Sequence, residues 1–128
     1  MNLELLYVAF YSYIIGSIPF GLLITKIFLK KDIRKIGSGN IGATNVLRTG
    51  SKSLGGATLI LDSFKGYVSI IITVYFFSNY TDNTSIIYFS ALICLLGHIF
   101  PIWLKFKGGK GVAVYLGILL SVSFNLGL

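Results

Sequence analysis

Acidic side chains are scarce in this sequence: four of its 128 residues are Asp or Glu, and charged residues of both signs make up only 12%. Apolar residues make up 55%. A soluble domain of this length must cover its surface largely with polar and charged groups, and so few charged side chains cannot do that. The shortage therefore excludes most classes of soluble protein and favours a membrane protein.

Cysteine and histidine are each present only once, as Cys94 and His98. A lone cysteine cannot form an intramolecular disulfide, and Cys94 lies in an apolar run, where a free cysteine is usually a small buried residue. Metal sites need several His, Cys, Asp or Glu ligands close together, and the sequence contains no cluster of them. We therefore expect no metal and no other cofactor.

Long apolar segments dominate the chain. A helix needs about 20 mainly apolar residues to cross the hydrocarbon core of a bilayer. Four segments approach or exceed this length: residues 3–29, 53–77, 85–104 and 112–128. They predict an all-α integral membrane protein, a helical bundle with about four visible spans in one membrane domain over residues 1–128. Gly16 and Pro19 predict a kink in the first span. We expect a longer native chain, because the sequence stops at Leu128 inside an apolar run.

The basic residues indicate the topology. Six of the eleven Lys and Arg residues lie in the connection 30–52, three lie in the connection 105–111, and none lies in 78–84. Short cytoplasmic loops accumulate Lys and Arg, so we expect the two basic loops inside and the N-terminus outside. The net charge of +7 would suggest nucleic acid in a soluble protein. Here topology and anion binding explain it, and we expect no nucleic-acid partner.

The first basic loop, residues 30–52, has the composition of an anion site. Its glycines allow backbone N–H groups to turn towards a ligand without a side chain in the way. Arg48 adds a planar guanidinium suited to a phosphate. The candidate ligand-binding residues beside Arg48 are Ser38, Gly39, Asn40, Gly42, Thr44 and Asn45. The alternative is a flexible loop whose cations attract anionic lipid headgroups. We favour a bound anion, because flexible linkers rarely mix Asn, Thr, Ile and Val in this way.

The second basic loop ends in FKGGKG, immediately before the fourth apolar segment. Its candidate anion-binding residues are Lys107, Gly108, Gly109, Lys110 and Gly111. Free N–H groups and the dipole of the following helix would both favour an anion there. The spacing does not match the nucleotide-binding P-loop motif, which removes the main support for nucleotide hydrolysis. An ordinary basic turn at the membrane surface is the alternative.

Asp62, Lys65 and His98 are titratable residues within the apolar segments. Asp62 and Lys65 are three positions apart and share one helix face. Each costs about 2.5–3.5 kcal/mol near the centre of a bilayer, so the pair must face other helices or water. It is either part of the site or a structural ion pair. His98 is a candidate general base beside the second loop, but we favour a packing role for it.

Four motifs resemble those of a bacterial enzyme family. They are SGNIGATNVLR at 38–48, GHIFPIWLKFKGGKGVA at 97–113, GSIPFG at 16–21 and LDSFKG at 61–66. The family is the membrane acyl-phosphate:glycerol-3-phosphate acyltransferases, often called PlsY. The resemblance implies a longer fold of about seven helices in the bacterial plasma (inner) membrane, with a third cytoplasmic motif that this sequence does not reach.

The resemblance also implies an activity. Family members transfer a fatty acyl group from acyl-phosphate to the 1-hydroxyl of glycerol 3-phosphate, which yields lysophosphatidic acid and phosphate for phospholipid synthesis. The implied partners are the two substrates, membrane lipids and the enzyme that makes acyl-phosphate. Ser38 and Arg48 match functional positions of the first motif. The family associates its second motif with glycerol-phosphate binding. The residues that match that motif here are Gly108, Gly109, Lys110 and Gly111. Val114 departs from the family, which often has Thr there.

Two other functions fit the same residues less well. A transporter for an anionic metabolite would favour charges spread through the depth of the bundle, and only Asp62 and Lys65 qualify. A scaffold that binds lipid headgroups would not need the particular side chains near Asn40 and Asn45. In the favoured reaction, donors from both loops hold the phosphates, and a substrate phosphate oxygen accepts the hydroxyl proton.

Overall fold

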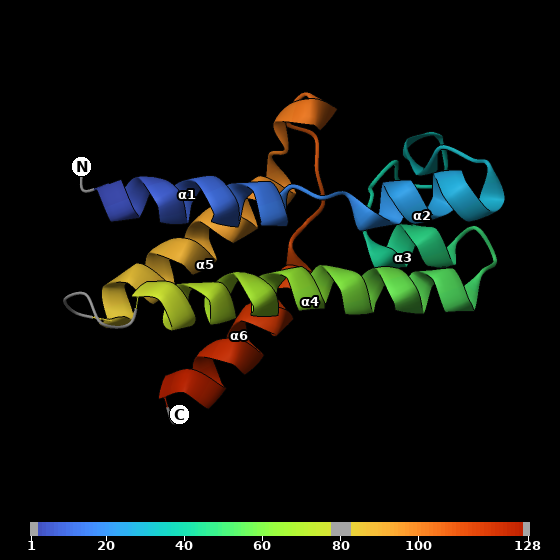
Figure 1. Cartoon of the computed structure of the whole chain (residues 1–128). Coiled ribbons are helices and arrows are strands. Elements are labelled where there is room, and N and C mark those ends of the chain that lie inside the picture. Colours follow the sequence, from blue (N-terminus) through green and yellow to red (C-terminus); the bar gives the residue numbers. More distant parts are fainter. Residues whose placement is uncertain (1–2, 78–82, 127–128) are drawn as a thin grey trace.

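The computed structural model describes residues 3–77 and 83–126, and every regular element among them is a helix, which confirms the all-α fold (Figure 1). The helices are α1 (Leu3–Gly16), α2 (Phe20–Leu29), α3 (Ala43–Leu47), α4 (Lys52–Phe77), α5 (Asn83–Ile99) and α6 (Val112–Leu126). Two short 3-10 turns are also present: η1 (Ile33–Lys35) lies in the first basic loop, and η2 (Ile102–Leu104) immediately precedes the second. Most of the connection expected at 78–84, and the end of the last expected span, lie outside the described residues.

Three segments of the described chain are long and apolar enough to cross a membrane: Leu3–Leu29, Lys52–Phe77 and Thr84–Leu104. The apolar helix α6 is shorter, with 15 residues. At about 1.5 Å per residue it extends about 22 Å, less than the ~30 Å of a hydrocarbon core. The chain is thus an integral membrane protein with three helical segments of spanning length and one shorter apolar helix.

The kink predicted in the first span is a complete break between α1 and α2. Pro19 cannot donate a backbone hydrogen bond, so the break leaves carbonyl groups without helical partners. The indole Nε1 of Trp103 donates to the carbonyl of Ser17 at 2.8 Å, and Nζ of Lys65 donates to the carbonyl of Ile18 at 2.8 Å. Side chains from two other helical segments therefore supply the donors that a membrane environment cannot.

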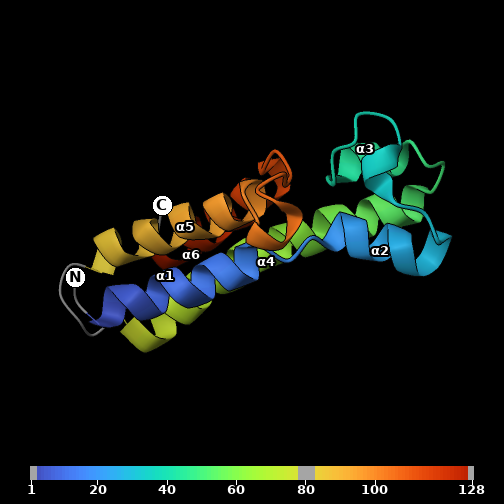
Figure 2. The same ribbon diagram turned by 90° about the horizontal axis from the view of Figure 1, so that it is seen from above.

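Helix α4 is the axis of the molecule. Its N-terminal half packs against α2 and α3, and its C-terminal half packs against α1, α5 and α6 (Figures 1 and 2). Glycines allow the closest crossings: a Cβ on Gly66 of α4 would lie 2.5 Å from the carbonyl oxygen of Val114 in α6. A Cβ on Gly97 of α5 would lie 2.5 Å from the carbonyl oxygen of Tyr13 in α1. Small residues are the usual means of close helix packing in membranes.

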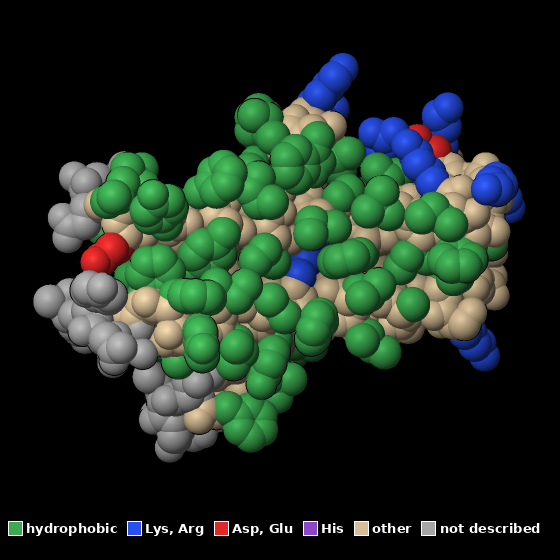
Figure 3. Space-filling model, in the orientation of Figure 1, with side chains coloured by type: hydrophobic (Ala, Val, Ile, Leu, Met, Phe, Trp, Pro, Cys, Tyr) green, Lys and Arg blue, Asp and Glu red, His purple; other side chains and the backbone are tan. Residues whose placement is uncertain are grey.

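The surface separates into apolar and basic regions. Large apolar side chains, including those of Phe10, Ile60 and Tyr75, are exposed along the outside of the bundle. Lys and Arg side chains gather over α2 and α3, at the right of Figure 3, and on the turn that projects above the bundle. An apolar belt with cations at one end is the pattern of a helical membrane protein.

Candidate active site

The first basic loop is organised around one buried amide, that of Asn45. Its Nδ2 donates to the carbonyl groups of Ile36 and Asn40 at 2.9 and 2.8 Å, and its Oδ1 accepts from the N–H of Ser38 at 3.2 Å. Nδ2 also lies 3.2 Å from the carbonyl of Ile33. Sequence analysis proposed this amide as a ligand donor, but its hydrogen bonds go to the backbone of the loop, so it holds the loop in shape.

Glycine permits the turns on either side of Ser38. Gly37 and Gly39 have φ values of 51° and 74°, in the left-handed region that other residues rarely adopt. A Cβ on Gly37 would also lie 2.9 Å from Cδ of Arg48. These two glycines therefore let Ser38 lie at the surface of the loop while the side chain of Arg48 passes close to Gly37.

The two arginines of this loop have different surroundings. Arg34 is paired with Asp32: its Nε and Nη2 donate to the carboxylate at 2.9 and 2.7 Å. The hydrogen bond and charge of Arg34 lower the pKa of Asp32 below its usual range. Arg48, at the end of α3, is exposed and has no ion pair with any residue in the described part of the chain. Only Arg48 is therefore free to bind an anion through its whole guanidinium group.

The second basic loop is fixed to the end of α5. The N–H of Gly108 donates to the carbonyl of Ile99 at 2.9 Å, and the N–H of Gly109 donates to the carbonyl of His98 at 3.1 Å. Sequence analysis expected these two N–H groups to be free for an anion, and that expectation is wrong. The last carbonyl groups of a helix lack partners within the helix, and the loop supplies them.

One cavity lies between the two loops, with a volume of about 200 Å³. Ten of the candidate residues line it: Ser38, Asn40, Gly42, Thr44, Asn45, Arg48, Asp62, His98, Lys110 and Gly111. The chain thus brings together two basic loops that are separated by the whole of α4 and α5. Sequence analysis predicted that they share a face of the membrane, and the structure places them at one cavity.

Five candidate residues do not line the cavity: Gly39, Lys65, Lys107, Gly108 and Gly109. Gly39 shapes the first loop, Gly108 and Gly109 fasten the second, and Lys107 is exposed outside. Sequence analysis missed four residues that do line it: Ala43, Leu59, Val112 and Ala113. Small apolar side chains carry no chemical signal, although Ala43 and Ala113 fall within the motifs quoted above.

The N-terminus of α6 forms part of the cavity wall. Val112 and Ala113 are the first two residues of this helix, and both line the cavity beside Lys110 and Gly111. The first N–H groups of a helix have no acceptor within it, and the helix dipole is positive there. Gly111 adopts a φ of 83°, which turns the chain from the loop into the helix. The positive end of the helix dipole and its free N–H groups therefore face this wall of the cavity.

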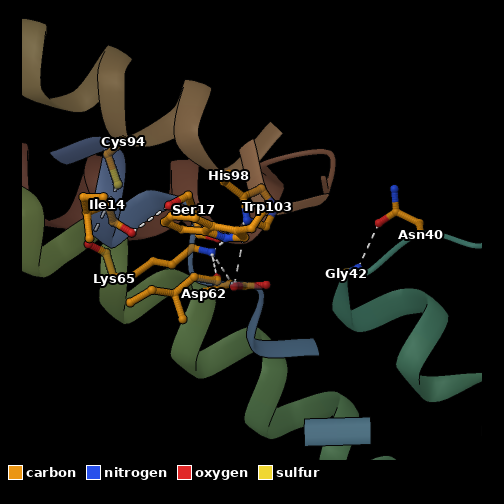
Figure 4. A network of polar contacts seen from close by, with 10 residues as sticks. Ile14, Ser17, Asn40, Gly42, Asp62, Lys65, Cys94, His98 and Trp103 are labelled. Carbon is orange, nitrogen blue, oxygen red and sulfur yellow. Dashed lines mark hydrogen bonds and ion pairs between the residues drawn. The ribbon is translucent and has the colours of Figure 1, made fainter. Parts of the chain in front are cut away.

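The side chains of Asp62, Lys65 and His98 contact one another beside the cavity. Nζ of Lys65 lies 2.9 Å from Oδ1 of Asp62 and 2.8 Å from Nδ1 of His98, and all three side chains are at most 4% exposed (Figure 4). Sequence analysis left open whether the pair is structural or part of the site. The structure supports both readings: Lys65 joins α4 to α5 and to the α1–α2 break, while Asp62 and His98 line the cavity.

Within residues 3–77 and 83–126, no group of three His, Cys, Asp or Glu side chains lies close enough to hold a metal ion. The cavity instead offers cations, amides and hydroxyl groups, which are donors suited to phosphate and carbonyl oxygens.

Comparison with known proteins agrees with this geometry. A family model described as glycerol-3-phosphate acyltransferase matches residues 6–128. The glycerol-3-phosphate acyltransferase of Pelagibacter ubique (strain HTCC1062) is 60% identical over 126 residues, which are 98% of this chain and 63% of that protein. The enzyme of the same description from Mesorhizobium japonicum is 49% identical over 128 residues, again 63% of its length.

Two solved structures are also similar. The crystal structure of PlsY (YgiH), an integral membrane glycerol 3-phosphate acyltransferase, in its glycerol 3-phosphate form superposes with a TM-score of 0.83 at 38% identity. The lysophosphatidic acid form gives a TM-score of 0.79. The match covers 95% of this chain and 59% of the first of those chains. This chain therefore spans about 60% of the length of the relatives that it matches.

Proposed function

The chain belongs to the glycerol-3-phosphate acyltransferase family, and from this premise we propose that its protein transfers a fatty acyl group from acyl-phosphate to the 1-hydroxyl of glycerol 3-phosphate. The products are 1-acyl-glycerol 3-phosphate and inorganic phosphate. The related PlsY was solved in forms with glycerol 3-phosphate and with lysophosphatidic acid, an acceptor and a product of this reaction.

The observation that carries the proposal is the shared cavity. Both substrates contain a phosphate group, and the cavity has a cation on each side: Arg48 from the first loop and Lys110 from the second. The acyl donor also has a hydrocarbon tail. Leu59 and Val112 line the cavity and are at the same time exposed on the apolar surface of the bundle. A donor can therefore place its phosphate in the cavity while its tail stays in lipid.

The chemistry is one acyl transfer. The 1-hydroxyl oxygen of glycerol 3-phosphate attacks the carbonyl carbon of the donor, and the bond from that carbon to the phosphate oxygen breaks. Cations and N–H groups around the cavity stabilise the charge that develops on the carbonyl oxygen and on the leaving phosphate. The hydroxyl proton passes to an oxygen of the leaving phosphate, so the step needs no separate base. Holding both phosphates fixes the reacting atoms close together.

The proposal includes a place in the cell. We place the protein in the bacterial plasma membrane with both basic loops in the cytoplasm, where glycerol 3-phosphate and the enzyme that supplies acyl-phosphate are found. Cysteines introduced at exposed Lys35 and Lys107 test this, because the native Cys94 is buried. A membrane-impermeant thiol reagent should label both from the cytoplasmic side. Labelling from opposite sides would exclude a shared site.

The direct test is reconstitution of the protein with acyl-phosphate and glycerol 3-phosphate, followed by detection of the acylated product. Arg48→Lys should lower turnover about 30-fold or more, because a lysine cannot replace a two-pronged phosphate contact. Arg34→Lys is the matched control, since Arg34 is occupied by Asp32, and it should change turnover less than about threefold. Equal small effects would indicate simple charge attraction. Uptake of glycerol 3-phosphate into sealed vesicles without acylation would identify a transporter.

A further inference from the structure

His98 is the residue whose chemistry the proposed reaction leaves unassigned. It lines the cavity, it is only 4% exposed, and a histidine next to a reacting hydroxyl is the obvious candidate for a general base. The hydrogen bonds around it decide whether it can accept a proton. They depend on Lys65, which lies between His98 and Asp62 (Figure 4).

The ammonium group of Lys65 is surrounded by three acceptors. Its Nζ lies 2.8 Å from the carbonyl oxygen of Ile18, 2.9 Å from Oδ1 of Asp62 and 2.8 Å from Nδ1 of His98. An ammonium group has three N–H donors and no acceptor, so Lys65 donates hydrogen bonds to the carbonyl of Ile18 and to Nδ1 of His98, and it forms an ion pair with Asp62. The carboxylate of Asp62 keeps the positive charge on Lys65 compensated inside the bundle.

This arrangement fixes the protonation of the imidazole. Because Lys65 donates to Nδ1, that nitrogen must carry a lone pair, and the single ring proton of a neutral histidine is on Nε2. Protonation of both nitrogens would set an N–H group against the ammonium at 2.8 Å. We infer that Lys65 holds His98 as the neutral Nε2–H tautomer, so that His98 offers the substrates a hydrogen-bond donor and cannot act as their base.

A comparison with a carboxylate–histidine pair explains why His98 cannot act as a base here. In such a pair the carboxylate accepts the proton of Nδ1, and Nε2 is left bare to act as a base. Here Oδ1 of Asp62 is 3.9 Å from Nδ1 of His98, too far for a hydrogen bond, and Lys65 bridges them. Because the lysine lies between the carboxylate and the imidazole, Nδ1 of His98 accepts a hydrogen bond here, whereas in a carboxylate–histidine pair it donates one.

The second loop shows where the donor is presented. Nε2 of His98 lies so close to Gly109 that a Cβ at that position would overlap it, and the N–H of Gly109 is bonded to the carbonyl of His98. Lys110 follows directly and lines the same cavity as His98. The Nε2–H group therefore lies against the residue before Lys110, at the wall where the proposed function places a phosphate or the developing oxyanion. This assignment of a ligand rests on the proposed function, whereas the tautomer does not.

The tautomer is measured by ¹⁵N NMR of the histidine-labelled protein in lipid nanodiscs at neutral pH, with the His98 signals identified by their loss in His98→Gln. We expect Nδ1 in the range of an unprotonated ring nitrogen and Nε2 in the range of a protonated one. A protonated Nδ1, alone or together with Nε2, would overturn the inference. This readout needs no substrate, so it stands even if the protein fails to transfer acyl groups.

Two lysine variants test the cause. Lys65→Met removes the donor and leaves Asp62 as the nearest polar partner of Nδ1, so the ring proton should move towards Nδ1. Lys26→Met, on the exposed side of α2, is the control and should leave the tautomer unchanged. An unchanged tautomer in Lys65→Met would show that Lys65 does not set it. If that variant does not fold, the spectrum of the unmodified protein still decides the question.

Measurements of turnover in variants of His98 distinguish a hydrogen-bond donor from a general base. A glutamine at position 98 keeps an N–H donor but cannot accept a proton at neutral pH, whereas leucine offers neither. We expect His98→Leu to lower turnover about 10- to 150-fold, the effect of losing one hydrogen bond to a charged group, and His98→Gln to restore at least about tenfold of that loss. Equal losses in the two variants would identify proton acceptance and overturn the donor role.

Discussion

The first basic loop folds largely on itself, whereas the second is held by the helix before it. In the first, the side chain of Asn45 binds the loop backbone, and two left-handed glycines shape the turns. In the second, backbone N–H groups of Gly108 and Gly109 bind the last carbonyl groups of α5. The comparison shows that a loop can be held in shape by its own buried side chains or by the end of a helix, and that each loop has a different weak point.

Asn45→Ala should have the largest effect, because it removes the centre of the first loop. Four backbone groups lose their partner at a side chain that is 2% exposed. An unsatisfied buried group costs about 1–3 kcal/mol, but three of the four contacts are only partly buried, so water can replace part of what is lost. We therefore expect the loop to be destabilised by about 2–4 kcal/mol and turnover to be nearly abolished. Hydrogen exchange should become fast in residues 33–48 and remain slow in α4 and α5.

Asn40→Ala is the matched control for that variant. The side chain of Asn40 accepts one hydrogen bond, from the N–H of Gly42 at 2.8 Å. We expect a loss of about 1 kcal/mol or less. If the two variants accelerated exchange equally, Asn45 would not be the centre of the loop.

Gly109→Ala tests the weak point of the second loop. The added Cβ overlaps the ring of His98, so the loop or the ring must move. We expect turnover to fall about tenfold, with little change in the thermal unfolding of the bundle in detergent. Gly56→Ala is the control: its Cβ meets no atom within 4 Å, and alanine in a helix interior should stabilise α4 by about 0.5–1 kcal/mol. Full activity in Gly109→Ala would show that the loop is not held against His98.

The smallest effect concerns the exposed ion pair of the first loop. Arg34 lowers the pKa of Asp32, so the pair contributes stability that is complete above the ordinary Asp pKa of about 4 and is lost as the pH falls towards the lowered pKa. Because the pair is exposed, we expect it to contribute at most about 1 kcal/mol. Arg34→Gln should reduce the acid dependence of local hydrogen exchange around η1 without changing turnover at neutral pH.

The sequence predicted the fold best where hydrophobicity alone determines which segments form membrane helices. Runs of apolar residues near the span length predicted the helices, and Gly16 with Pro19 predicted a disturbance in the first. The full break and its partners could not be predicted. That Trp103 and Lys65 supply donors to Ser17 and Ile18 depends on how distant helices pack.

At the site, the sequence predicted the types of residue that take part better than it predicted their positions and hydrogen-bond partners. Glycine, amide and cation content pointed to both loops, but composition does not say which groups already have partners. Asn45, Gly108 and Gly109 use their N–H groups on the backbone, which only the folded structure shows. Sequence analysis chose Arg48 without comparing it with Arg34, and the structure supplies the difference, because Arg34 is paired with Asp32. An aspartate two residues before an arginine was a usable hint of that pairing. Leu59 carried no hint, because its type is common throughout the chain.

The interrupted first segment has a consequence for how the protein enters the membrane. The donor for Ile18 lies 47 residues further along the chain and the donor for Ser17 lies 86 residues further. While only α1 and α2 have left the ribosome, the carbonyl of Ile18 can still accept the N–H of Phe20, but the carbonyl of Ser17 would face hydrocarbon at a cost of several kcal/mol. The segment can therefore settle at its final depth only after α4 and η2 have arrived, so later segments determine when the first one is fully inserted.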